Sequence, residues 1–365
     1  MSSLSIAIVG LPNVGKSTLF NALTDSSVLA ANYPFATIEP NTGIVPVPDA
    51  RLNALSDLYH GAPIKPATVT FVDVAGLVKG ASEGEGLGNQ FLSHIRATNA
   101  IVQVVRAFED SAVLTDEATG THDPAKDIDI INTELVLADL QTVDKRLPRL
   151  EKEVKANAKL APLLETLGQI RATLDSGKPI FADSKLLEAS AEFNDLFLLT
   201  AKPIIYVFNV DEQGLSDESL HKNLGDLVAP AQALFICAKL EDELRSLDAE
   251  DRQELLESYG QTEPGLNQLI HSAYETLGLQ SYLTAGDKEV RAWTIRAGST
   301  APQAAGVIHG DFERGFIAAD VVDYDDLITA GSVSAARSAG KLRTEGKTYV
   351  MRPGDVVEFK FNVSK

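Results

Sequence analysis

The segment from Gly10 to Thr18, with the sequence GLPNVGKST, brings two glycines, a lysine and two hydroxyl side chains into nine residues. Glycines let backbone N–H groups turn toward an anion, and a lysine can reach the outer phosphates of a nucleotide. An apolar run, Ser5 to Val9, precedes this loop, and a helical pattern follows from Leu19. A buried strand, a glycine-rich loop and a helix N-terminus in that order predict a phosphate-binding loop, or P-loop.

The polar residues of this loop have separate expected roles. Lys16 should contact the β- and γ-phosphates and stabilise charge on a transferred phosphoryl group, which makes it a predicted catalytic residue. The Ser17 hydroxyl should bind Mg²⁺. Asn13 should either help to hold a monovalent cation such as K⁺ or only brace the loop. The residues predicted to bind the phosphates are Asn13, Val14, Gly15, Lys16, Ser17 and Thr18.

The segment from Ala31 to Gly43 is predicted to supply a second Mg²⁺ ligand. It holds two prolines and two asparagines, which are typical of a loop. Thr37 is the candidate ligand and Thr42 is the alternative; the segment can also be a plain connection.

The apolar run from Val69 to Asp73 predicts a strand that ends in a carboxylate. Asp73 should hold Mg²⁺ through a water molecule, and Gly76 should leave room for a γ-phosphate contact, which places Gly76 with Lys16 in the predicted catalytic site. Ras-like enzymes have a water-orienting glutamine at the position where this chain has Leu77. The glycine-rich residues from Leu77 to Gly88 should become ordered when a γ-phosphate is bound.

A later strand, Pro203 to Val210, leads into the sequence Asn-Val-Asp-Glu at residues 209–212. Guanine-specific proteins carry Asn-Lys-x-Asp there, and the aspartate accepts two hydrogen bonds from guanine. Here Glu212 stands in place of the aspartate, and its longer side chain places the carboxylate differently. Val210 stands in place of the lysine that packs over the base. Adenine is therefore the predicted base, and Asn209, Val210 and Glu212 are the residues predicted to bind it. The loop after the strand Ala233 to Cys237, with Ala238 and Lys239, should close the base pocket. Alternatively, Asn209 and Glu212 only face solvent.

Composition limits the classes of protein that fit. The chain has 365 residues, 44% of them hydrophobic, and a net charge of −19, which argues against general nucleic-acid or membrane binding but not against a local basic patch. Its single cysteine, Cys237, excludes an intrachain disulfide. Without a basic and apolar leader or an apolar run of transmembrane length, we expect a cytoplasmic protein without a membrane partner.

The elements between and after these motifs predict further domains. About 95 residues separate the strand Ala100–Ala107 from Pro203, too many for a simple crossover. Apolar residues at spacings of three and four predict an antiparallel pair of helices there, which Pro148 should kink or restart. Its lysines should form a solvated face, or else an arm that touches a partner; they include Lys152, Lys155 and Lys159.

The C-terminal part predicts a small mixed β domain with one main helix. A helical pattern extends from Ala249 to Tyr282, strands follow at residues 290–296, 316–322, 349–351 and 355–361, and a helix is expected at 301–309. The region from Gly331 to Lys365 is basic, which favours either a local RNA contact or an ordinary solvated surface. Its cations are Arg337, Lys341, Arg343, Lys347, Arg352, Lys360 and Lys365.

The motifs together resemble the Obg-like ATPase family of the bacterial YchF type. The resemblance covers nearly the whole chain and is carried by GLPNVGKST, NYPFATIEPN, DVAGLVKGASEGEGLGNQFL and INTEL. It implies an α/β fold of the TRAFAC-class P-loop NTPases: a discontinuous G domain at 1–124 and 202–279, a helical coiled-coil insertion at 125–201, and a C-terminal β-grasp (TGS) domain at 280–365. It also implies slow Mg²⁺-dependent ATP hydrolysis, weaker binding of GTP, association with the 50S ribosomal subunit, and a role in translation or stress regulation.

The chain departs from that family at one place. Members often carry a histidine in the loop after the Phe108 strand, where this chain has Thr115, with His122 nearby. The residue that positions the attacking water is therefore not assigned. Two alternatives stay open: an Obg-type GTPase, and a non-catalytic scaffold that senses nucleotide.

Overall fold

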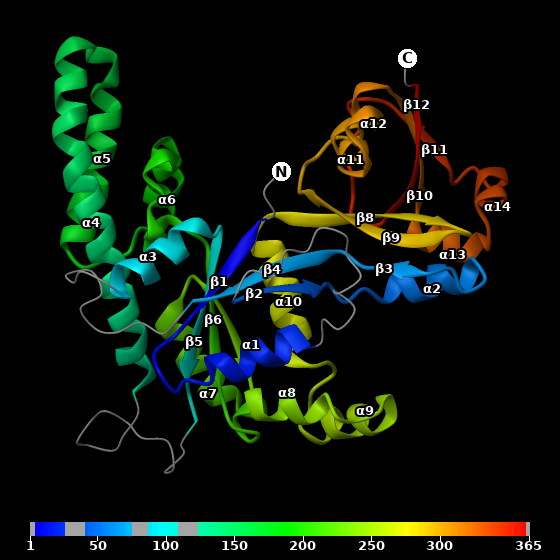
Figure 1. Ribbon diagram of the computed structural model, residues 1–365, viewed down its shortest axis with the longest axis horizontal. Helices are drawn as coiled ribbons and strands as arrows, with labels where there is room; N and C mark the ends of the chain where they lie inside the picture. The colour runs from blue at the N-terminus through cyan, green and yellow to red at the C-terminus, as the bar shows by residue number, and fades with distance from the viewer. Residues whose placement is uncertain (1–3, 26–40, 75–86, 109–122, 363–365) are drawn as a thin grey trace. The chain divides into compact units, whose positions relative to one another are not determined.

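The computed structural model describes residues 4–25, 41–74, 87–108 and 123–362, and Figure 1 shows its helices and strands. The chain forms two compact units. The first comprises residues 1–44 and 70–269, and the second comprises residues 45–69 and 270–365. Each unit is built around its own six-stranded sheet. No helix in the described ranges is long and apolar enough to cross a membrane.

The sheet of the first unit has the strand order β2-β4-β1-β5-β6-β7. Parallel pairing joins β1 to β4 and β5, β5 to β6, and β6 to β7. Parallel strands bring their carboxyl ends to one edge, where α/β proteins bind ligands. The strands are β1 (Ser5–Val9), β2 (Thr42–Pro46), β4 (Thr68–Asp73), β5 (Ala100–Arg106), β6 (Ile204–Asn209) and β7 (Gln232–Ile236). This arrangement confirms the predicted α/β fold and five of its strands.

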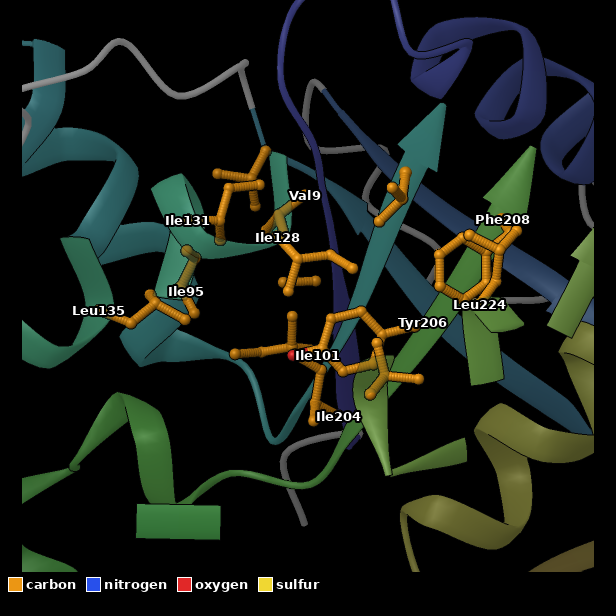
Figure 2. Close-up of a cluster of buried hydrophobic side chains, with 14 of the residues drawn as sticks. Val9, Ile95, Ile101, Ile128, Ile131, Leu135, Ile204, Tyr206, Phe208 and Leu224 are labelled. Carbon is orange, nitrogen blue, oxygen red and sulfur yellow. The ribbon is translucent and has the colours of Figure 1, made fainter. Parts of the chain in front are cut away.

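Helices cover this sheet through apolar faces. Figure 2 shows Ile101 of β5 and Tyr206 of β6 packed near Ile131 and Leu135 of the long helix α4 (Pro124–Ala156). All seven residues of β5 and all six of β6 are buried, which is typical of central parallel strands. The other helices of the body are α1 (Lys16–Asp25), α3 (Leu87–Ala97), α7 (Glu218–Val228), α8 (Ala238–Leu244), α9 (Ala249–Ser258) and α10 (Gly265–Thr276).

The predicted helical pair is present as α4 and α5 (Ala161–Asp175), which lie side by side in Figure 1. A 3₁₀ turn, Ala158–Leu160, connects them, and the short helix α6 (Ser184–Ser190) follows. Their apolar faces form a separate core that includes Val143, Leu150, Leu167 and Ile170. The predicted restart at Pro148 is wrong, because α4 continues through this residue. Pro148 is exposed, so water can hydrate the carbonyl that its missing N–H leaves unpaired.

Two buried carboxylates on helices of this unit hydrogen-bond to backbone N–H groups of other segments. Asp139 of α4 accepts hydrogen bonds from the backbone N–H groups of Leu199 (2.8 Å) and Thr200 (2.7 Å) and from the Thr200 hydroxyl (2.8 Å). Glu241 of α8 accepts one from the N–H of Gly265 (2.6 Å), at the first residue of α10. Burial raises the pKa of both carboxyl groups, that of Glu241 to about 7.

The second unit holds a mixed sheet in the order β11-β10-β12-β8-β9-β3. Its strands are β3 (Ile64–Lys65), β8 (Leu279–Gly286), β9 (Glu289–Arg296), β10 (Phe316–Asp323), β11 (Arg343–Glu345) and β12 (Asp355–Phe361). Its helices are α2 (Ala50–Leu58), α11 (Ala301–Ile308), α12 (Gly310–Arg314), α13 (Tyr324–Ala330) and α14 (Val333–Ser338). Apolar residues of α11 and the sheet form its core.

Two expectations for this part of the chain are corrected. The helical pattern predicted to Tyr282 ends at Thr276, and β8 begins at Leu279, because this segment pairs along its length with β9. The strand predicted at 349–351 is a single bridge between Val350 and Thr300. The structure also groups residues 45–69 with the second unit, whereas the predicted G domain includes them.

Candidate nucleotide-binding site

The loop between β1 and α1 has the geometry that its glycines predict. A Cβ on Gly10 would come within 2.8 Å of the Val14 side chain and 2.9 Å of the Val104 carbonyl oxygen, so the backbone passes too close for any side chain. Gly15 has a φ of +91°, in the left-handed region that glycine favours. Asn13 also has a positive φ, of 63°. The loop therefore curls back upon itself before α1 begins at Lys16.

The P-loop lysine meets the carboxylate that ends β4. The Lys16 ammonium forms an ion pair with Asp73, and the Lys16 side chain is only 10% exposed. The parallel register sets Asp73 opposite Ile8 of β1, two residues before Gly10, which brings the two predicted residues together. A bound phosphate would compete with Asp73 for the ammonium group.

Asn209, the last residue of β6, joins two loops at the edge of the sheet. Its side-chain N–H₂ donates to the Val14 carbonyl in the P-loop (3.0 Å), and its side-chain oxygen accepts from the Ala238 N–H at the start of α8 (3.0 Å). Asn209 is buried, and a Cβ on Gly15 would lie 2.2 Å from its amide nitrogen. The predicted base residue is thus also a clamp between the phosphate loop and the base loop.

A cavity of about 680 Å³ extends from the P-loop to these base-site residues. It brings together eight residues that the sequence predicts for the site: Asn13, Gly15, Thr18, Asn209, Val210, Glu212, Ala238 and Lys239. Val14 belongs to the same loop, and Lys16 and Ser17 are the first two residues of α1, which follows it. Thr42, the alternative Mg²⁺ ligand, is the first residue of β2. Predictions for Thr37, Gly76, Leu77 and Thr115 concern positions outside the described residues.

Glu212 and Lys239 form an ion pair at the base end of this cavity, with Lys239 Nζ 2.8 Å from Glu212 Oε1. The hydrogen bond from Lys239 lowers the pKa of the Glu212 carboxyl group. The same bond raises the pKa of the Lys239 ammonium group. Val210 is 2% exposed and packs in the core, so its side chain does not cover a base as a lysine would.

Five residues of the cavity wall were not predicted: Phe108, Asp211, Cys237, Asp242 and Glu243. Phe108 follows β5, and Arg106 of that strand is opposite Asn209 of β6. The Arg106 guanidinium lies 4.7 Å from the centre of the Phe108 ring. The sequence could have identified Phe108, because it follows a predicted buried strand whose end was expected beside the base motif at Asn209.

The donor atoms near the P-loop fit Mg²⁺ beside a triphosphate. Mg²⁺ prefers oxygen ligands and takes few of them from protein when phosphates and water are present. Here an exposed Ser17 follows Lys16, and the Asp73 carboxylate lies within ion-pair distance of the same lysine. No cluster of three or more His, Cys, Asp or Glu residues in the described ranges forms a metal site by itself, so such an ion would depend on the nucleotide.

Two family models match the chain. Residues 5–137 match the family described as 50S ribosome-binding GTPase, and residues 279–362 match the YchF-GTPase C-terminal family, described as a protein of unknown function. Together they cover the P-loop, Asp73 and the strands of the second sheet, but not the base motif at residues 209–212.

Several curated proteins resemble the chain over its full length. The Ribosome-binding ATPase YchF of Bacillus subtilis is 48% identical over 99% of this chain and 100% of that protein. The protein of the same name from Escherichia coli O157:H7 is 48% identical over 98% of each. Among solved structures, the Schizosaccharomyces pombe YchF GTPase superposes with a TM-score of 0.85 at 40% identity, with 98% of each chain covered. A GTP-binding protein from Pyrococcus horikoshii, at 19% identity and a TM-score of 0.60, shares the fold.

Proposed function

The chain belongs to the YchF family of ribosome-binding ATPases, and on this premise we propose that it is a Mg²⁺-dependent P-loop ATPase that associates with the ribosome through the 50S subunit. One observation in the chain itself supports the ATPase most directly. The P-loop and both base loops line one cavity at one edge of one sheet, and Asp73 at the end of β4 pairs with Lys16 of the P-loop motif. A cytoplasmic location is part of the same proposal.

In the proposed hydrolysis, the main contribution of the protein's own side chains is that Lys16 stabilises negative charge. Lys16 forms an ion pair with Asp73. A triphosphate presents several oxygens to that ammonium, so Lys16 exchanges its partner and places its charge on the phosphoryl group that is transferred to water. The loop N–H groups and the N-terminus of α1 bind the same phosphates. Mg²⁺, held by Ser17 and Thr37 with Asp73 acting through water, would neutralise the phosphate charge.

ATP is the proposed nucleotide, with GTP weaker. Support comes from the base end of the cavity, where Glu212 replaces the aspartate of guanine-specific sites and is already bound by Lys239. A carboxylate held in this way is a poor partner for the two adjacent N–H donors of guanine. The loss of a bidentate contact of this kind costs roughly 1–3 kcal/mol, by analogy with base recognition elsewhere.

K⁺ is a second proposed cofactor, through Asn13. Asn13 is exposed, lines the cavity and has a positive φ of 63°. If Asn13 helps to hold K⁺, ATP turnover should be faster in K⁺ than in Na⁺, and Asn13→Ala should remove that difference. Equal rates in both salts would leave Asn13 as a brace of the loop.

Nucleotide titration tests the proposal. ATP and GTP are titrated into nucleotide-free protein with Mg²⁺, and ATP should bind at least tenfold more tightly, a difference of about 1.4 kcal/mol. Turnover by wild type should exceed that of Lys16→Ala. Tighter GTP binding would favour an Obg-type GTPase, and turnover equal to that of Lys16→Ala would favour a non-catalytic nucleotide sensor.

A contact between RNA and the C-terminal basic region was the second partner prediction. Four of its seven cations are paired with carboxylates of their own unit. Arg337 and Lys360 pair with Asp320, Lys341 with Asp326, and Arg343 with Glu345. These pairs reduce the charge available to a phosphate, so this contact stays a prediction with less support than the sequence alone suggested.

A further inference from the structure

The distal part of the helical pair is basic, although the protein as a whole is strongly acidic. Residues 145–171 contain seven lysines and arginines and three glutamates, whereas the whole chain has a net charge of −19. This segment includes the last three turns of α4, the connecting turn and most of α5. Its charge therefore differs in sign from the net charge of the rest of the chain.

Three of these seven cations lie along one face of α4. Lys145, Arg149 and Lys152 follow one another at spacings of four and three residues, which places them in one row along a helix. All three are exposed, and Val143 and Leu150 on the opposite face are buried in the core against α5. With Lys159 in the connecting turn, the row extends about 20 Å along the arm, at 1.5 Å per residue. We name these four residues the α4 stripe.

The acidic residues nearby are mostly engaged with other cations. Glu153 binds Arg146 (2.9 Å), and Asp144 binds Arg171 (2.8 Å), in both cases to the side of the stripe. Glu153 also interacts with Arg149 at longer range, and Glu151 is an exposed neighbour of Lys152. Within the described ranges, no member of the α4 stripe forms an ion pair at hydrogen-bond distance. The row keeps its positive charge toward solvent.

A small polar cavity lies at the base of the stripe, between α3 and α4. It has a volume of about 220 Å³, and its wall includes Ser93, Arg96, Thr142 and Lys145. Arg96 Nη2 donates to the Thr142 hydroxyl (3.1 Å), while Arg96 Nε is buried and has no hydrogen-bond partner in the described part of the chain. Arg96 and Lys145 both lie in the wall of this cavity, and two cationic side chains there favour the binding of an anion.

We propose that the α4 stripe and this cavity form a binding track for the phosphate backbone of RNA. The proposal rests on the proposed association with the ribosome and names the surface that makes it. Successive helical turns are about 5.4 Å apart, so a row of cations can follow consecutive phosphates of one strand. None of the large exposed hydrophobic residues of the described chain lies on α4. A protein partner would instead favour apolar or aromatic anchors.

The test compares two triple variants with equal changes in charge. The first is Lys145→Gln, Arg149→Gln and Lys152→Gln in the full-length protein. The matched control is Lys341→Gln, Lys347→Gln and Arg352→Gln, three exposed cations of the C-terminal basic region. Affinity for purified 50S subunits is measured by co-sedimentation between 50 and 200 mM KCl, and the same titration is repeated with a protein-free RNA duplex. Thermal unfolding and ribosome-free ATP turnover show that each variant is folded.

The α4 variant should bind 50S subunits at least tenfold more weakly than wild type at 100 mM KCl, and the slope of log affinity against log salt should fall by about two to three. The control should retain wild-type affinity within about twofold. Binding to the RNA duplex should fall in parallel. Arg96→Gln alone should reduce the slope by about one.

Three outcomes overturn parts of the reasoning and are distinguishable. If wild type itself does not bind 50S subunits, the proposed function fails. If wild type binds and the α4 variant binds equally, the proposed track is wrong, and loss in the control variant would assign the contact to the C-terminal region. If the α4 variant loses 50S binding with an unchanged salt slope and unchanged RNA binding, the stripe contacts a ribosomal protein and the RNA proposal is refuted.

Discussion

Replacement of Asn209 by alanine should damage the nucleotide site without touching a phosphate. The amide makes two buried hydrogen bonds, one to the Val14 carbonyl and one from the Ala238 N–H, each 3.0 Å long. Alanine removes both and leaves a buried carbonyl and a buried N–H without partners. Because each orphaned group costs about 1–3 kcal/mol, the free energy of unfolding should fall by about 2–6 kcal/mol, with the lower end expected if water reaches the two groups.

Part of that cost should appear as lost ATP affinity. The two loops that Asn209 joins must hold their positions around the same cavity. We expect the loss of the clamp to weaken ATP binding by tenfold or more, about 1.4 kcal/mol. Asn209→Asp distinguishes the two hydrogen bonds. Its carboxylate still accepts from the Ala238 N–H, but its second oxygen cannot donate to the Val14 carbonyl and repels it. This variant should therefore impair the P-loop at least as strongly as alanine.

Urea unfolding and calorimetric ATP titration measure the two effects. Asn99→Ala is the matched control, because within the described residues the Asn99 side chain makes one hydrogen bond, which is exposed and comes from the Ser5 N–H (3.1 Å). The control should lose no more than about 1 kcal/mol of stability and should bind ATP as wild type does. If Asn209→Ala matches the control in both stability and ATP affinity, the clamp described here does not position the site.

Four other substitutions have defined outcomes. Gly15→Ala should abolish ATP binding in the titration, because its Cβ would lie 2.2 Å from the Asn209 amide nitrogen at a φ of +91°; near-normal affinity would show that the loop can relax. Asp73→Asn frees Lys16 from its ion pair, so Mg²⁺-free nucleotide binding should strengthen while Mg²⁺-dependent turnover falls; unchanged turnover would remove Asp73 from the metal site. Burial raises the pKa of Glu241 to about 7, so its contribution to stability is present below about pH 4.5 and is lost as pH rises to 7. In wild type, the free energy of unfolding from urea curves should fall by roughly 3 kcal/mol between about pH 4.5 and 7 because of Glu241, and Glu241→Gln should abolish this fall. An unaltered pH profile in the variant would contradict this assignment. Asp139→Asn places an amide N–H₂ against the Thr200 donors and should lower unfolding stability by about 2–4 kcal/mol, whereas a stable variant would show that the junction tolerates repacking.

The strands of the nucleotide unit could be predicted because each is a short apolar run next to a turn or a chemical motif. The predicted runs at Ser5, Val69, Ala100, Pro203 and Ala233 all coincide with strands to within one or two residues. The P-loop and the base motif could likewise be recognised from the sequence, because phosphate and base chemistry restricts which residue types can serve there.

Other features depend on partners that are distant in sequence. Strand β3 has two exposed residues, Ile64 and Lys65, and is a strand only because it pairs with β9, more than 220 residues later. The Asn209 amide was expected beside a base, but no local pattern indicates that its two polar atoms bind Val14 and Ala238. The exposed face of α4 was weighed as an ordinary solvated surface, because the missing ion pairs become visible only when side chains are placed.

The path of the chain between the two units has a consequence for synthesis. Residues 45–69 leave the first unit and contribute α2 and β3 to the second, and the partner strand β9 begins only at Glu289. During translation residues 45–69 leave the ribosome early, and β3 cannot pair until β9 has also been synthesised. At about 5–20 residues per second, that delay is on the order of 10–45 s. Until then α2 and β3 lack the sheet that they join, so this early segment of the growing chain stays exposed to proteases and to misassembly until β9 has been made.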